Sequence, residues 1–174
     1  ITLISFINLL KKGWIMDSDI KLYLERAENE LELAKIIFTL TENKNMQQDV
    51  FHIDKTNTFY SAVISHAYYC IFYSAKAYLL KQGIKVSPPE EHKKSFLAFK
   101  KLVENNVVNA QLLKLYEEVM VKAETLLDIF KTEKKKRGEF TYNTLPQANR
   151  GPAQESLGNS QTFFKHIFSL CSNS

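Results

Sequence analysis

Apolar residues recur at steps of three and four through most of this chain, and the densest run covers residues 58–82. The run contains no Asp, Glu, Pro or Gly, and apolar residues occupy nearly every side of a helix drawn through it. A helix of this kind is buried, and at about 1.5 Å per residue it spans a small domain. Asn57 or Thr58 can cap its start, and Gly83 can end it. The pattern therefore predicts a core helix on which the other helices pack.

Other stretches show the same periodicity with one polar side, which is typical of helices that pack against a core through one face. The paired prolines at 88 and 89 and several polar stretches interrupt them, which indicates connections. We therefore expect an all-α protein, an antiparallel up-and-down bundle of four long helices and one short helix. The further predicted helices are 18–40, 90–104, 110–136 and 153–170, and the predicted connections are 41–57, 83–89, 105–109 and 137–152.

The length of 174 residues favours one domain. We place this domain at residues 16–171, because Met16 precedes a well-capped helix start, and expect a disordered tail at 172–174. Residues 1–15 are either an extension upstream of the natural start or an amphipathic segment that packs on the domain or on a partner. Their apolar run is too short to cross a membrane, and its lysines follow it, which is the reverse of a signal peptide.

Composition narrows the functional classes. The net charge of +4 permits an anionic partner. The two cysteines are Cys70, in the predicted core helix, and Cys171, near the predicted tail, so we expect no disulfide and a cytoplasmic protein. Phosphate-binding glycine loops, dinucleotide-binding glycine patterns and zinc-protease motifs are absent from the sequence. We expect no cofactor, no metal site and no membrane association.

The densest cationic stretch closes the helix predicted at 110–136. The two interpretations of it are a complement to the negative end of the helix dipole and a patch that contacts phosphates. The aromatic residues Phe140 and Tyr142 follow closely, where they can stack on exposed bases. Five cationic residues lie within seven positions: Lys131, Lys134, Lys135, Lys136 and Arg137.

Three parts of the sequence together resemble a known family: SAVISHAYYCIFYSAKAYLLKQGI at residues 61–84, His92 after the following connection, and RGEFTY at 137–142. They are similar to HEPN domain proteins of the prokaryotic type often encoded beside a minimal nucleotidyltransferase. The resemblance covers roughly residues 17–170. It implies a helical bundle that forms a homodimer, with a functional groove near the dimer interface. It also implies a toxin–antitoxin-like system and, in active members, metal-independent cleavage of RNA by an Arg and a His.

The sequence departs from the family pattern at one catalytic position. Arg137 matches the arginine, but Tyr142 stands where the histidine is expected. Cleavage of RNA without a metal needs a general base and a general acid near neutral pH, and a tyrosine with an ordinary pKa near 10 is a poor base. We therefore interpret Arg137 and Tyr142 as a binding or residual catalytic site, with Lys134, Lys135, Lys136 and Phe140 contacting RNA or nucleotide. In related toxin pairs, the resemblance implies, the nucleotidyltransferase modifies a tyrosine near this motif, and Thr144 occupies that position here. Tyr142 is therefore only a weak candidate for such a modification.

His66 and Tyr69 form a secondary candidate site on the predicted core helix, where helical spacing brings them together. A histidine hydrogen-bonded to a neighbouring helix is favoured over a catalytic one. His52 and His92 are expected at the surface or in loops.

Two functions stay open. The first is a HEPN subunit of a two-component nucleotidyltransferase or toxin–antitoxin system, binding RNA or nucleotide, with endoribonuclease activity undecided. The alternative is a non-enzymatic helical dimer for protein assembly or ligand sensing.

Overall fold

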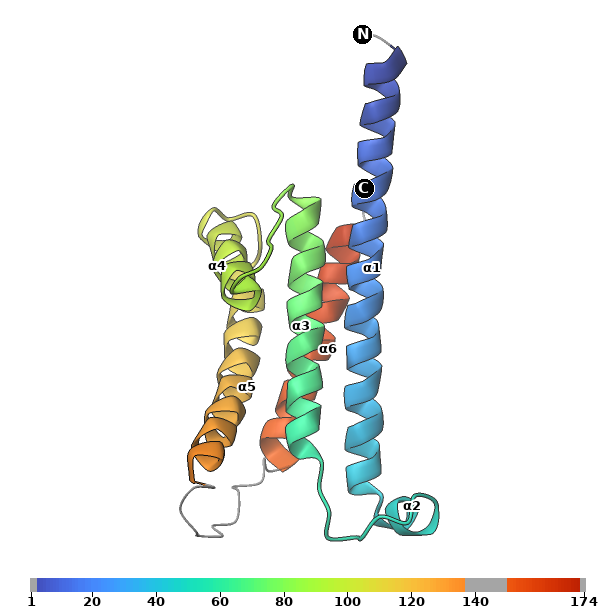
Figure 1. Cartoon of the computed structure of the whole chain (residues 1–174), viewed down its shortest axis with the longest axis vertical. Helices are drawn as coiled ribbons and strands as arrows, with labels where there is room; N and C mark the ends of the chain where they lie inside the picture. Colours follow the sequence, from blue (N-terminus) through green and yellow to red (C-terminus); the bar gives the residue numbers. More distant parts are fainter. Residues whose placement is uncertain (1–2, 137–149, 173–174) are drawn as a thin grey trace.

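The computed structural model describes the backbone of residues 3–136 and 150–172 and the side chains of residues 18–125 and 150–172. The described chain is all-α, as predicted, and its four long helices alternate in direction along one axis (Figure 1). α4 is the short helix that was expected, whereas α2 is an additional one. The helices are α1 (Leu3–Glu42), α2 (Lys44–Asp49), α3 (Tyr60–Lys81), α4 (Glu91–Glu104), α5 (Ala110–Lys136) and α6 (Arg150–Ser172).

α3 is the central helix, since α1, α4, α5 and α6 all pack against it. This confirms the prediction made from residues 58–82. Its side toward α5 and α6 joins the main core, in which Phe99, Tyr116 and Phe163 are fully buried and their rings meet at centroid distances of 5.5–5.9 Å. Burial of such large apolar groups is the dominant favourable term in folding.

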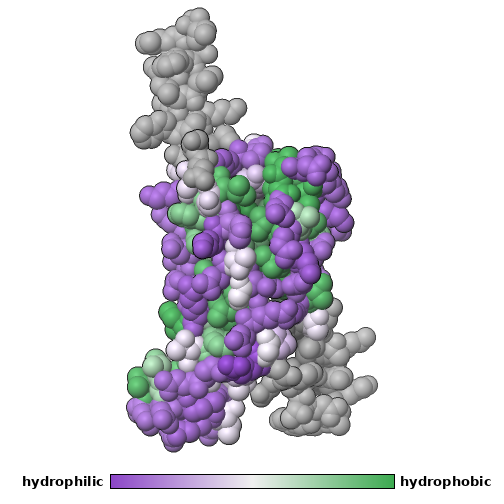
Figure 2. Space-filling view, turned by 180° about the vertical axis from the view of Figure 1, so that it is seen from behind, coloured by the Kyte–Doolittle hydropathy of each residue, from purple (hydrophilic) through white to green (hydrophobic). Residues whose placement is uncertain are grey.

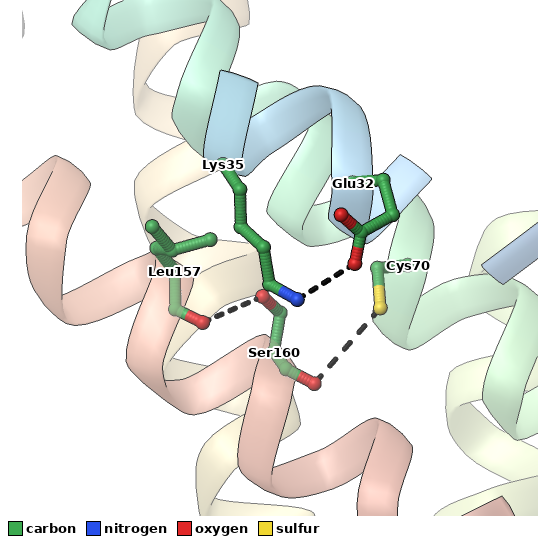
Figure 3. Close-up of polar contacts among 5 residues, drawn as sticks. All are labelled: Glu32, Lys35, Cys70, Leu157 and Ser160. Carbon is green, nitrogen blue, oxygen red and sulfur yellow. Dashed lines mark hydrogen bonds and ion pairs between the residues drawn. The ribbon is translucent and has the colours of Figure 1, made fainter. Parts of the chain in front are cut away.

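Small side chains line the junction of α1, α3 and α6. Ala27 and Ala34 of α1 are fully buried, as is Cys70 of α3. The Cys70 thiol lies 3.9 Å from the carbonyl oxygen of Ser160, and the Ser160 hydroxyl donates to the carbonyl of Leu157 at 2.9 Å (Figure 3). Small residues here let the three helices approach closely.

Two bounds of the first helices differ from the prediction. α1 begins at Leu3 and not at residue 18, because residues 3–17 contain no proline to stop it. The stretch 41–57, predicted as a connection, contains α2. The side chain of Asn43 caps α2 by accepting from the backbone N–H of Met46 at 3.0 Å.

The prediction for the start of α3 was wrong, and the prediction for its end is confirmed. The N-cap is Phe59, and neither Asn57 nor Thr58. Its backbone N–H donates to the hydroxyl of Thr41 at 3.2 Å, so the end of α1 supplies the hydrogen-bond partner that we expected from a local side chain. Gly83 follows the helix with φ of 74°, a conformation that favours glycine.

α6 is longer than predicted at both ends. It begins at Arg150, so that Pro152 lies in its first turn, where a missing N–H does no harm. It continues through Ser172, so Cys171 lies in the helix and packs against the main core. The Lys81 ammonium of α3 donates hydrogen bonds to the carbonyl oxygens of Leu170 at 2.7 Å and Cys171 at 3.3 Å. These bonds give a partner to two of the last carbonyl groups of α6, which have none within the helix.

Candidate functional site

The cationic motif predicted from the sequence is only partly within the described structure. Arg137, Phe140 and Tyr142 lie outside the described residues. Lys134, Lys135 and Lys136 form the last residues of α5, and their side chains also lie outside the described part. The end of α5 lies at the same end of the bundle as the C-terminus of α1 and the start of α6 (Figure 1).

His66 is held by a carboxylate of the neighbouring helix. Its Nδ1 lies 2.6 Å from Oε2 of Glu30 in α1, and both side chains are half-buried. This confirms the prediction of a histidine hydrogen-bonded to a neighbouring helix. The carboxylate fixes the orientation of the imidazole ring.

Tyr69 lies one turn from His66 on the same side of α3 and is 39% exposed. Its ring is 6.2 Å from that of Tyr73 and 5.7 Å from that of Tyr68. His92 of α4 meets Tyr69 edge-on at 5.8 Å. The structure therefore places Tyr69 within a cluster of aromatic rings, whereas the hydrogen-bond partner of His66 is Glu30 of α1.

An ion pair with a buried lysine lies beside this aromatic cluster. Lys76 of α3 pairs with Glu91 of α4, and the lysine side chain is only 7% exposed. Its ammonium also lies 4.4 Å from the ring centroid of Tyr23 in α1. Burial disfavours the ammonium, but hydrogen bonds with Glu91 and Tyr23 outweigh burial and raise the pKa of Lys76. The pair links three helices at one point.

His92 stacks on Phe72 at a centroid distance of 4.0 Å, and its Nδ1 lies 2.9 Å from the hydroxyl of Tyr68. Burial lowers the pKa of His92; the Glu91 carboxylate opposes this, and the Lys76 ammonium adds to it. Burial, with smaller contributions from Glu124 and Tyr69, raises the pKa of Tyr68 to about 12. At neutral pH the pair is therefore an uncharged imidazole beside an uncharged phenol.

Sequence reasoning did not select Lys76, Glu91 or Tyr23. One signal was present, because Lys76 lies several residues before the end of a helix that is otherwise almost free of charge. A buried lysine needs a carboxylate, but the sequence does not show which one folds against it.

A second polar cluster lies at the opposite end of α3. Oε1 of Glu42 accepts from the Tyr60 hydroxyl at 2.6 Å, and its Oε2 accepts from Nε of Arg150 at 2.6 Å. The bonds from Tyr60 and then Arg150 lower the pKa of Glu42. Glu42 and Arg150 border an open hollow of about 640 Å³ whose lining also includes Phe38, Asn43 and Lys44. The cluster joins the ends of α1, α3 and α6, and the charges of Glu42 and Arg150 balance, so that Lys44 leaves the lining of the hollow with one net positive charge.

In the part of the chain that the structure describes, no group of three His, Cys, Asp or Glu side chains is arranged to hold a metal ion. None of the described helices has both the length and the apolarity required to cross a membrane.

These features define a helical-bundle protein whose central helix carries an aromatic and histidine-containing side. The sequence matches the HEPN domain family over residues 52–165, which include α3, α4, α5 and most of α6. The chain belongs to the HEPN domain family, which associates it with nucleotide- or RNA-related function. No curated protein and no solved structure matches it.

Proposed function

We propose that this chain is a HEPN subunit that binds RNA or nucleotide in the cytoplasm through phosphate contacts at the C-terminal end of α5. The observation that carries the proposal is the position of the cationic run: α5 continues through Lys136, and Arg137 follows directly within the family match. Lysine and arginine side chains supply the charge that neutralises phosphates. The guanidinium of Arg137 can in addition bind one phosphate through two hydrogen bonds.

The partners follow from the same proposal. The chain acts as a homodimer, and a nucleotidyltransferase is its partner in a two-component, toxin–antitoxin-like system. Endoribonuclease activity requires a group that takes a proton near neutral pH. Tyr142 can do so only where its pKa is strongly lowered, so binding is proposed as the primary activity and cleavage as the activity to be tested.

The test compares the wild-type chain with Arg137→Ala and with Lys165→Ala, an exposed lysine of α6 that controls for loss of one charge. Each is titrated with single-stranded RNA at several salt concentrations. Arg137→Ala should weaken binding and reduce the slope of log affinity against log salt by about one, since one phosphate contact is lost. Lys165→Ala should leave the slope unchanged.

Cleavage is scored separately by expressing the wild-type chain and Arg137→Ala in a bacterial host and following growth and the integrity of total RNA. RNA fragmentation by the wild type alone would establish a ribonuclease. Equal salt dependence in all three proteins, with no fragmentation, would contradict the proposal and favour a helical module for protein assembly. Arg137→Ala should fold normally, because a cationic residue at a helix end contributes under about 1 kcal/mol.

A further inference from the structure

The hollow of about 640 Å³ between α1, α2 and α6 is rich in polar side chains, and the fold uses only part of their hydrogen-bonding capacity. Its volume falls within the range of about 300–1,000 Å³ that is typical of ligand sites. The side chains come from three separate elements of the bundle. The lining consists of Phe38, Thr39 and Glu42 of α1, Asn43, Lys44 and Asn45 at the start of α2, and Arg150 at the start of α6.

Glu42 is the one carboxylate among the described residues of this lining, and both of its oxygens are engaged. Oε1 accepts from the Tyr60 hydroxyl and Oε2 accepts from Nε of Arg150, each at 2.6 Å. Because its charge is matched by the guanidinium beside it, this carboxylate repels an anion less than a free one does. The hollow therefore keeps the positive charge of Lys44.

The unused groups of the two asparagines are hydrogen-bond donors. Oδ1 of Asn43 accepts from the backbone N–H of Met46 at 3.0 Å, and Oδ1 of Asn45 accepts from the Lys55 ammonium at 3.3 Å. An N–H group and an ammonium can only donate, so these bonds also fix which amide atom is the nitrogen. Neither Nδ2 group has a partner among the residues that the structure describes.

The cationic side chains of the lining also retain donors. Arg150 uses Nε for Glu42 and Nη1 for Oε1 of Gln154, at 3.1 Å. Its Nη2 has no partner within the described part of the chain, and the side chain is 57% exposed. The Lys44 ammonium donates to the carbonyl of Asn57 at 3.0 Å and has further hydrogens to donate. Several free donors together with positive charge favour an anion that carries many oxygens, as a phosphate does.

The hollow lies at the end of the bundle where α1 and α5 end and α6 begins (Figure 1). Seen from behind, the surface around α2 at this end is largely hydrophilic, and the largest apolar area lies toward the opposite end (Figure 2). α2 is only six residues long, so the donors that matter here are side chains and not the dipole of a helix.

We propose that this hollow binds a phosphate group of RNA or of a nucleotide. Arg150 and Lys44 supply the positive charge, and the amide nitrogens of Asn43 and Asn45 donate to the remaining phosphate oxygens. The inference rests on the proposed function, because it takes RNA or nucleotide as the ligand. It adds a second phosphate contact, separate from Arg137 and at the same end of the bundle.

The decisive variant is Asn43→Asp/Asn45→Asp, called the hollow variant, which replaces two donors by carboxylates with almost no change in volume. It keeps the cap of α2, because aspartate caps a helix as well as asparagine does. The matched control is Asn29→Asp/Asn109→Asp. It adds the same two charges at exposed positions outside the hollow, and Asn109 likewise accepts from a backbone N–H, that of Gln111.

Binding of a fluorescein-labelled single-stranded RNA to each protein is followed by fluorescence anisotropy at low salt. The hollow variant should bind about tenfold more weakly than the wild type, because its carboxylates face the phosphate at short range. The control should stay within about twofold of the wild type, since distant exposed charges are screened. Unlabelled AMP is then added as a competitor. Displacement of the RNA would assign a monoester phosphate to the hollow, and its absence would assign a diester phosphate within the strand.

A second variant keeps the inference testable where the hollow variant does not fold, as judged by circular dichroism. Lys44→Gln retains a donor for the carbonyl of Asn57 and removes one charge. It should reduce the slope of log affinity against log salt by about one, as expected for the loss of one phosphate contact.

Two outcomes would overturn the inference. One is an affinity of the folded hollow variant equal to that of the wild type or of the control, and the other is an unchanged salt slope in Lys44→Gln. Arg137 is intact in all of these variants. A loss of affinity in the hollow variant with no effect of Arg137→Ala would keep the hollow and reject the α5 contact, and the reverse result would keep only the α5 contact.

Discussion

The two sides of α3 show how one apolar helix can serve two purposes. Toward α5 and α6 it presents Ile71 and Leu79 to a dry core, where Phe163 is fully buried. Toward α1 and α4 it presents Tyr69 and Lys76, whose hydroxyl and ammonium need partners or solvent. The first side depends on filled volume and tolerates any well-packed apolar group. The second depends on individual polar pairs, so its stability can be changed by removing one charge.

The largest expected effect is on the core side. Phe163→Ala should lower the free energy of unfolding by about 4 kcal/mol, because it removes buried apolar surface and leaves a cavity. Phe168→Ala on the same helix is the matched control, since Phe168 is 47% exposed. It should cost less than about 1 kcal/mol. Urea unfolding followed by circular dichroism measures both, and equal losses would mean that the core is not centred on Phe163.

An intermediate effect is expected on the polar side. Glu91→Gln should lower the free energy of unfolding by about 2 kcal/mol, since it leaves the buried Lys76 ammonium without a counter-charge while Glu91 keeps some contact with solvent. The double variant Lys76→Met/Glu91→Gln should recover part of this loss, because no charge is then buried alone. A double variant less stable than Glu91→Gln would show that the Lys76 ammonium is not penalised by burial.

The smallest effect concerns pH. Burial lowers the pKa of His92 in the folded state, so below the ordinary histidine pKa of about 6.5 the unfolded chain binds more protons than the folded one. This contribution to stability is present at neutral pH and is lost as the pH falls. His92→Phe retains a ring against Phe72 and removes the titration. The wild type should therefore lose stability relative to His92→Phe between pH 7 and pH 5, and parallel curves in urea unfolding would contradict the assignment.

The helices whose signals are local could be predicted from the sequence. The range of α5, Ala110–Lys136, was predicted in full, and α3 was predicted to within about two residues at each end. The predicted helix ends were wrong where the hydrogen-bond partner of the helix end comes from a residue far away in the sequence. Thr41 of α1 supplies the partner for the first N–H of α3, and Lys81 of α3 supplies the partner for the last carbonyls of α6.

At the candidate site, too, the local features could be predicted from the sequence and the contacts between separate helices could not. The sequence predicted the kind of environment around His66, because a polar ring on a buried helix requires a partner. It did not predict that Glu30 is that partner, nor the pairing of Lys76 with Glu91, because each pair joins separate helices. Arg137 and Tyr142 lie outside the described residues, so their roles stay predictions.

The two cysteine thiols of this chain are buried to different extents, so their reactivity can report local and larger opening of the fold. Burial raises the pKa of Cys70 to about 12 and that of Cys171 to about 11. Cys70 is sealed where α1, α3 and α6 meet, and a thiol reagent reaches it only when those helices separate. Cys171 lies in the last turn of α6, where fraying alone exposes it. The ratio of the two alkylation rates therefore reports, in the unmodified protein, how much opening is local and how much involves the whole bundle.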